Sequence, residues 1–110
     1  MQISWQDFEA VEIRVGTIIE AQEFPEATKS AYKLKVDFGE FGIKKSSAQI
    51  TAIYALSELV GKQVIAVTNF PPKQIGSFMS ECLVTGFVQQ DGSVVLVIPD
   101  KTVTNGLRLA

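Results

Sequence analysis

The sequence predicts an all-β protein built as a five-stranded Greek-key barrel, with a short helix between the third and fourth strands and short extensions at both ends. Short runs alternate apolar and polar residues, glycine and proline separate these runs, and one internal stretch has helical spacing. The chain has 110 residues, which is typical of a single domain, and we expect the barrel core at about residues 12–98.

The first half of the chain predicts a short helix and three strands. Ser4 and Asp7 have the spacing of a capping box, which indicates a helix at the start. The first strand is expected over 12–22, with Gly16 marking a bend or bulge. The second strand is expected over 31–38 and the third over 43–48, joined as a hairpin through a glycine-containing turn. The apolar face of the second strand consists of Tyr32, Leu34, Val36 and Phe38.

The second half supplies the helix and the remaining strands. Apolar residues over 49–60 recur near helical spacing, and Gly61 is a suitable helix end. Further strands are expected over 64–68, 81–88 and 94–98, the last two joined by a turn at 90–92. With the helix between the third and fourth strands, this is the layout of an OB-fold, which usually binds oligonucleotides or other polymers on one face.

The composition argues against catalysis and against metal or cofactor binding. There is no histidine, the commonest general base and a common metal ligand. Cys82 is the only cysteine, so no internal disulfide can form, and we expect it to be a small buried apolar residue in a reducing compartment.

We see no signal peptide and no apolar run near the ~20 residues that span a bilayer, so a cytoplasmic location is expected.

The charges are unevenly distributed although the net charge is only −2. Up to Glu26, six carboxylates accompany Arg14 alone, whereas seven lysines and three carboxylates lie between Lys29 and Lys73. Such a bias permits a basic face that attracts phosphate or acidic peptide. An ordinary mixed-charge surface is an equally good interpretation.

The segment Asn69–Ile75 is the strongest candidate for a binding site. Pro71 and Pro72 cannot donate to a β-ladder, so we expect the chain to leave the barrel here as a stiff loop. Phe70 and Ile75 would contact an apolar peptide side chain, with Lys73 at the rim. Alternatively, Phe70 fills the barrel and the prolines only end a strand.

Three further segments are weaker candidates. In Lys44–Gln49 strand alternation lets only one lysine–serine pair face outward, to bind peptide backbone or phosphate or simply to shape the corner before the helix. Phe78–Ser80 offers an adaptable contact, or lies in the core or a dimer interface. Arg14 lines a ligand groove or, preferably, pairs with Glu12 or another carboxylate. The full candidate set for peptide or RNA binding is Arg14, Lys44, Lys45, Ser46, Ser47, Gln49, Asn69, Phe70, Pro71, Pro72, Lys73, Gln74, Ile75, Phe78, Met79 and Ser80.

Several segments together carry a family resemblance that covers nearly the whole chain. They are Ile13–Ile18, Lys44–Thr51, Gly61–Val67, Asn69–Gly76, Phe78–Glu81 and Pro99–Asp100. In this order they resemble the CsaA family, a branch of the tRNA-binding OB domains. The resemblance implies a cytoplasmic homodimeric chaperone connected with protein export, which binds unfolded or preprotein segments. It also implies the alternative of a module that binds tRNA. Thr104 replaces a proline that is usual in the family, which slightly loosens the following Asn-Gly turn.

The C-terminal residues support a second copy of the chain as a partner. Val103, Leu107 and Leu109 are apolar and hard to bury within a five-stranded barrel. We expect them to cross to a second subunit under two-fold symmetry.

Overall fold

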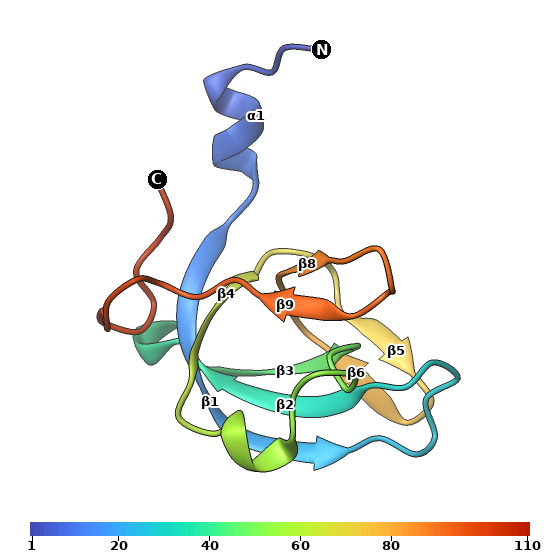
Figure 1. The fold of residues 1–110 in the computed structure, drawn as a ribbon. Coiled ribbons are helices and arrows are strands. Elements are labelled where there is room, and N and C mark those ends of the chain that lie inside the picture. Colours follow the sequence, from blue (N-terminus) through green and yellow to red (C-terminus); the bar gives the residue numbers. More distant parts are fainter.

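In the computed structural model, which describes residues 1–110, strands enclose one apolar core and a short helix projects away from them (Figure 1). Five strands form an antiparallel sheet in the order β3-β2-β1-β4-β7. This sheet curls into a nearly closed barrel, which confirms the predicted OB-type fold. Its members are β1 (Ile13–Glu23), β2 (Tyr32–Asp37), β3 (Ile43–Ala48), β4 (Gln63–Val67) and β7 (Leu83–Val84). Two hairpins complete the fold, β5 (Lys73–Ile75) with β6 (Phe78–Ser80) and β8 (Gly86–Val88) with β9 (Val94–Leu96).

The long strand β1 bends so that it can pair with two different neighbours. Its first part pairs with β4 and its later part with β2, and the register shifts between Ile18 and Glu20. The sequence predicted a bend or bulge at Gly16, but the bulge lies further along the strand, between Ile18 and Glu20. Gly16 serves packing instead, because a Cβ atom there would lie 2.6 Å from Cγ1 of Val36 and 2.8 Å from the ring of Phe38.

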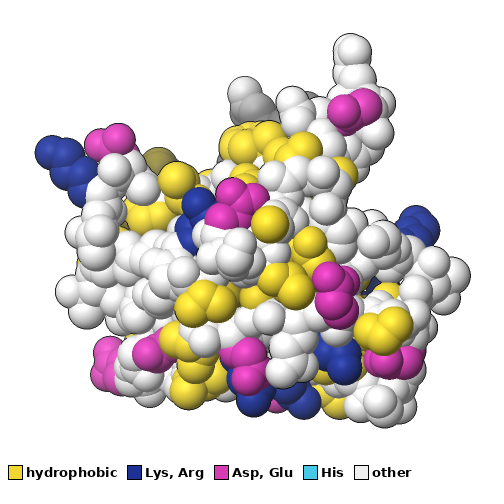
Figure 2. Space-filling model, turned by 60° about the horizontal axis from the view of Figure 1, so that its bottom comes forward, with side chains coloured by type: hydrophobic (Ala, Val, Ile, Leu, Met, Phe, Trp, Pro, Cys, Tyr) yellow, Lys and Arg dark blue, Asp and Glu magenta, His cyan; other side chains and the backbone are white.

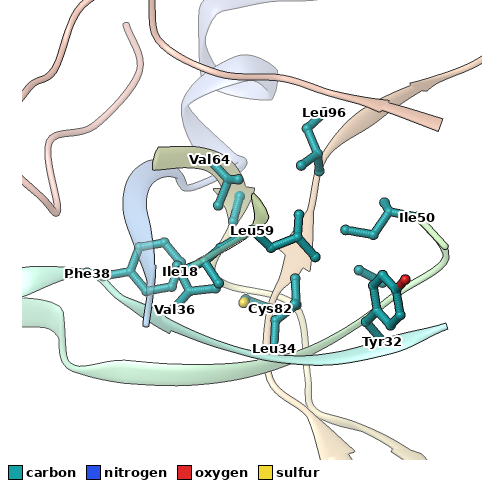
Figure 3. Close-up of a cluster of buried hydrophobic side chains, with 12 residues drawn as sticks. Ile18, Tyr32, Leu34, Val36, Phe38, Ile50, Leu59, Val64, Cys82 and Leu96 are labelled. Carbon is teal, nitrogen blue, oxygen red and sulfur yellow. The ribbon is translucent and has the colours of Figure 1, made fainter. Parts of the chain in front are cut away.

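The barrel interior is filled by side chains from β1, β2, β3, β4 and β9 and from the segments between strands (Figure 3). The alternation predicted for β2 is confirmed, since Leu34, Val36 and Phe38 are at most 1% exposed. Cys82 points its sulfur into this core, and burial raises the pKa of its thiol to about 12. It is therefore an inert apolar residue, as predicted.

The helix predicted over 49–60 is wrong in extent, because only the 3₁₀ turn η2 (Leu56–Glu58) forms there. Long-range side-chain bonds hold this segment in an irregular path. The hydroxyl of Tyr32 donates to the carbonyl of Tyr54 (2.8 Å), and the Tyr54 hydroxyl accepts from the backbone N–H of Leu96 (3.0 Å). Ile50 and Leu59 both reach the core from the two ends of the segment.

The strand predicted over 81–88 is interrupted at Thr85. The N–H and the hydroxyl of Thr85 both donate to the carbonyl of Ile65, at 2.9 and 2.7 Å, while its own carbonyl accepts from Val97. This arrangement separates β7 from β8. The hairpin of β8 and β9 then crosses one end of the barrel (Figure 1).

Both ends of the chain lie outside the barrel (Figure 1). The helix α1 (Trp5–Ala10) has the predicted capping box of Ser4 and Asp7, and none of its residues is buried. The C-terminal segment runs beside the start of β1, where Gly106 bonds Val15 and Leu109 bonds Ile13. None of the helices combines the length and the hydrophobicity that a membrane-spanning helix needs.

Candidate functional site

A pocket of about 440 Å³ opens between the end of β3, the loop before β5 and the hairpin of β5 and β6. It combines apolar walls from the loop and hairpin with hydroxyl, amide and charged groups. We call it the main pocket. Its lining residues are Ser47, Gln49, Phe70, Pro71, Lys73, Ile75, Ser80, Glu81, Cys82 and Leu83. The structure thus brings together members of Asn69–Ile75, Lys44–Gln49 and Phe78–Ser80, whereas Arg14 is not part of the pocket.

The loop before β5 is anchored at its first residue. Asn69 donates from Nδ2 to the carbonyl of Ala10 (2.8 Å) and accepts at Oδ1 from the N–H of Glu12 (2.9 Å). Asn69 therefore fixes the loop to the start of β1 and does not line the main pocket. The next residue, Phe70, is 54% exposed, so it does not fill the barrel. Two prolines follow it and stiffen the loop, because each fixes its own backbone φ angle.

After the prolines the chain forms a hairpin, where the sequence predicted only a stiff loop. Lys73 is opposite Ser80 and Ile75 is opposite Phe78, so these four residues share one face. Lys73, Ile75 and Ser80 line the main pocket from that face. Gln74 and Met79, which are opposite each other, lie on the other face.

The barrel closes along a seam, the boundary between the edge strand β3 and residues 80–84. The N–H of Lys45 donates to Oε1 of Glu81 (2.9 Å), and the N–H of Glu81 donates to the Lys45 carbonyl (2.7 Å). The N–H of Ser47 donates to Oγ of Ser80 (3.0 Å). Side chains therefore bond β3 amides that a neighbouring strand would otherwise use.

Strand alternation separates the four central candidates of β3. Ser46 is fully buried, with its hydroxyl near the Ser47 carbonyl, so it cannot contact a ligand. Lys44 is opposite Val36, whose side chain is in the core. Lys45 and Ser47 form the outward pair, as the sequence predicted for one lysine and one serine.

A cluster of aromatic rings and lysines flanks the main pocket. The rings of Phe24 and Phe78 meet edge to face at a centroid distance of 5.3 Å. The Lys45 ammonium lies 5.3 Å from the Phe78 centroid, and that of Lys33 lies 5.1 Å from the Phe24 centroid. Lys33 also forms an ion pair with Glu26 at 3.6 Å. Lys45 and Lys73 have no such carboxylate partner, which leaves two free positive charges beside the pocket.

Arg14 lies away from the main pocket and has a structural role. Its Nε donates to Glu12 at 2.8 Å, its Nη1 donates to the Gly106 carbonyl at 2.8 Å, and its guanidinium stacks 3.6 Å from the centroid of Phe41. The hydrogen bond from Arg14 lowers the pKa of the Glu12 carboxyl. The preferred sequence interpretation, pairing with a carboxylate, is confirmed, and that carboxylate belongs to Glu12.

Sequence reasoning missed several residues of this region. Glu81 and Leu83 fell within the strand expected over 81–88 and were given no binding role, and Phe24 and Lys33 were not among the candidates. Only the outward position of Lys33 in an alternating strand was a usable signal. The other positions depend on where the seam closes, which no local pattern shows.

The surface charge is mixed on the face shown in Figure 2, where basic side chains lie beside acidic and apolar ones. Lys35 and Glu20, whose side chains form an ion pair at 3.4 Å, give a further example of opposite charges lying side by side. This favours the mixed-charge interpretation for that face. No group of three or more cysteine, aspartate or glutamate side chains is arranged to hold a metal ion.

Comparison with known proteins yields a consistent group of relatives. The sequence model of a family described as "Putative tRNA binding domain" matches residues 13–108. The crystal structure of chaperone CsaA from Bacillus anthracis is 44% identical over the full length of both chains, with a TM-score of 0.94. That of the CsaA chaperone protein from Picrophilus torridus is 51% identical, covers 99% of this chain and 100% of the other, and has a TM-score of 0.92.

Methionine–tRNA ligases match as well, but only in part. The enzyme from Porphyromonas gingivalis is 35% identical over 94% of this chain, which spans only 15% of that enzyme's length. The matched portion therefore leaves most of the ligase without a counterpart here.

Proposed function

This chain belongs to the CsaA family within the putative tRNA-binding domains, and we propose that it is a non-enzymatic chaperone that binds unfolded or preprotein segments. A cytoplasmic location and a connection with protein export are parts of this proposal that rest on the family. The observation that carries it is the main pocket, in which the exposed Phe70 and one proline, Pro71, lie beside polar side chains.

The physical case for a peptide ligand begins with Phe70. A large apolar side chain that is half exposed gains free energy when a ligand removes it from water. Pro71 and Pro72 restrict the loop in advance, so little conformational entropy is lost on binding. Ile75 and Leu83 extend the apolar wall, while Ser47 and Gln49 offer hydrogen bonds at its edge. An apolar pocket with a polar edge suits a peptide side chain and its adjoining backbone.

A homodimer is part of the same proposal, and a second apolar surface supports it. A depression of about 340 Å³ lies along Val15, Ile65 and Val97 and continues to Leu107 and Leu109. Leu107 and Leu109 are 54% and 49% exposed, so the barrel alone does not bury them. In a dimer with two-fold symmetry, this surface of each subunit would be buried against the same surface of the other. The dimer would then present two main pockets to one client.

An aggregation assay tests the chaperone proposal. A denatured client, such as chemically unfolded citrate synthase, is diluted into buffer with and without the protein, and light scattering is followed. We expect scattering to fall as the protein approaches equimolar amounts. Unchanged scattering, together with no binding to a panel of apolar peptides, would contradict the proposal. Mass by light scattering at micromolar concentration tests the dimer, and a monomer would contradict that part.

Binding of tRNA is a second candidate function, favoured by the family match and by the lysines around Phe78. Lys33 and Lys45 lie within 5.9 Å of its ring centroid, and this half-buried ring is a possible platform for a base. Phosphate-dominated binding weakens steeply with salt. A titration with total tRNA at 50 and 200 mM salt tests it, and no binding at the lower salt would exclude this function.

A further inference from the structure

At one end of the barrel seam, beside the main pocket, backbone groups at the end of β3 have no hydrogen-bond partner across the seam. The strands β3 and β7 are the two edges of the five-stranded sheet and share no hydrogen-bonded ladder. Glu81 and Ser80 bond the amides of Lys45 and Ser47 at one end of the seam. The N–H of Gln49, which follows at the other end, has no hydrogen-bond partner in the chain.

The geometry of β3 determines which backbone groups face outward at this end. In an antiparallel ladder, residues bonded to the neighbouring strand alternate with residues whose peptide groups point away from it. The amides of Lys45 and Ser47 point away from β2 because they bond the seam side chains. By the same alternation, the Ser47 carbonyl and the Gln49 N–H point away from β2. The carbonyl receives only a 3.5 Å contact from the Ser46 hydroxyl.

Apolar space lies on both sides of these two backbone groups. The main pocket is on one side, and a second depression of about 350 Å³ is on the other, next to β7 and the hairpin of β8 and β9. The two share Ser47, Gln49 and Leu83 as lining residues. A strand in this position would place alternate side chains on opposite faces, so each depression can receive one.

We propose that an extended peptide binds here by adding a short strand to the free end of β3. Its backbone bonds the Gln49 N–H and the Ser47 carbonyl, and one of its apolar side chains enters the main pocket beside Phe70. This inference rests on the proposed peptide-binding function and specifies how that function is achieved. Main-chain pairing gives affinity without a sequence requirement, while the pocket selects an apolar residue.

The charges beside the groove define the ligand further. Lys73 lines the main pocket and is exposed, Lys45 precedes Ser47 on β3, and neither forms an ion pair. The carboxylate of Glu81 is already bonded to a backbone amide. A peptide with an acidic residue near its apolar one is therefore complementary to the site.

The test removes the amide hydrogen of Gln49 and keeps the rest of the pocket. Gln49→Pro deletes the N–H, and Gln49→Ala is the matched control because it also loses the side chain but keeps the N–H. The probe is a fluorescein-labelled, end-blocked peptide, Ser-Asp-Val-Leu-Val-Asp-Ser, measured by fluorescence anisotropy. We expect Gln49→Pro to bind it about tenfold more weakly than Gln49→Ala, as for the loss of one main-chain hydrogen bond. Thermal unfolding of both variants verifies the fold.

Two measurements on the unaltered protein decide the question independently of folding. N-methylation of the probe peptide, one residue at a time, should weaken binding about tenfold at the position that bonds Ser47. Hydrogen exchange of the Gln49 amide should slow when the unmodified peptide is bound. Tight binding of the unmodified peptide with no effect of N-methylation and no protection of Gln49 would overturn this inference and leave the chaperone proposal standing. No binding of the unmodified peptide would overturn both. Protection of this amide by oligouridylate and not by the peptide would also overturn the inference.

Discussion

Glu81 and Lys45 are joined by two hydrogen bonds across the barrel seam. One links the two backbones, and the other links the Lys45 backbone to the Glu81 side chain. The Glu81 N–H donates to the Lys45 carbonyl at 2.7 Å, and Oε1 of Glu81 accepts from the Lys45 N–H at 2.9 Å. A single residue thereby reproduces the paired bonds of a β-ladder at a place where two edge strands do not pair. The seam is held shut at this end and stays free at Gln49.

Removal of the Glu81 carboxylate should loosen the closed end of the seam. In Glu81→Ala the Lys45 amide loses its partner, and we expect the free energy of unfolding to fall by about 1–2 kcal/mol. Urea denaturation measures this loss. Glu40→Ala is the matched control, since Glu40 is exposed on the short turn after β2 and forms no ion pair. Equal stabilities of the two variants would show that the Lys45–Glu81 bond contributes nothing.

Gly16 should tolerate no side chain as long as its neighbours are unchanged. A Cβ atom there meets Val36 at 2.6 Å and the Phe38 ring at 2.8 Å, and both neighbours are fully buried. We expect Gly16→Ala to destabilise the protein by about 1–3 kcal/mol through overpacking. The double variant Gly16→Ala/Val36→Ala creates room, so its measured loss should be smaller than the sum of the two single losses. Simple additivity would mean that the close approach is not the cause.

Sequence reasoning succeeded where a local pattern determines the structure and failed where residues distant in the sequence determine it. The barrel was predictable because alternation in β2 reports directly that one face is buried, and Leu34, Val36 and Phe38 are in the core. The helix over 49–60 was wrong because its apolar spacing is local. The bonds that decide its path join Tyr54 to residues 22 and 42 positions away.

The candidate site divides in the same way. Phe70 and Pro71 were identified because prolines restrict the backbone wherever they occur. Glu81 was missed because its role depends on Lys45, which is 36 positions away and adjoins it only after the barrel closes. A polar residue in an apolar strand is a weak indication of a binding site, as Arg14 shows. Its contacts are an ion pair with Glu12 and the ring of Phe41.

The buried thiol of Cys82 predicts a pH dependence at high pH. Burial raises its pKa from 9.0 to about 12. Between these values the unfolded chain releases the thiol proton while the folded chain keeps it. The stability that the buried, protonated thiol contributes to the fold is therefore fully present below pH 9 and is lost as the pH rises toward about 12. Other groups titrate in this range, so the measurement is the difference between the wild type and Cys82→Ala.

We expect the difference in unfolding free energy between wild type and Cys82→Ala to shrink as the pH rises above 9. In parallel, the native thiol should react slowly with a disulfide reagent at pH 8, because the thiolate is the reactive form. Rapid reaction without prior unfolding, or a pH-independent stability difference, would contradict the assigned burial of this group.

Phe70 should contribute to ligand binding and little to stability. Its side chain is 54% exposed, so Phe70→Ala removes few internal contacts, and we expect the thermal midpoint to change by less than about 2 °C. Binding of an apolar peptide should weaken roughly tenfold or more, because the phenyl ring forms one wall of the main pocket. Phe87→Ala is the matched control. Phe87 is 67% exposed on β8 and lines neither depression of the seam.

The paired variants separate a specific pocket from general stickiness. If any exposed ring served equally well, Phe70→Ala and Phe87→Ala would weaken peptide binding to the same degree. If the loop acts as a preformed wall, only Phe70→Ala weakens it, and Phe70→Leu restores much of the affinity because an apolar side chain again fills the same position. A normal affinity in Phe70→Ala would remove the main pocket from the binding surface, since its largest apolar wall would then be dispensable.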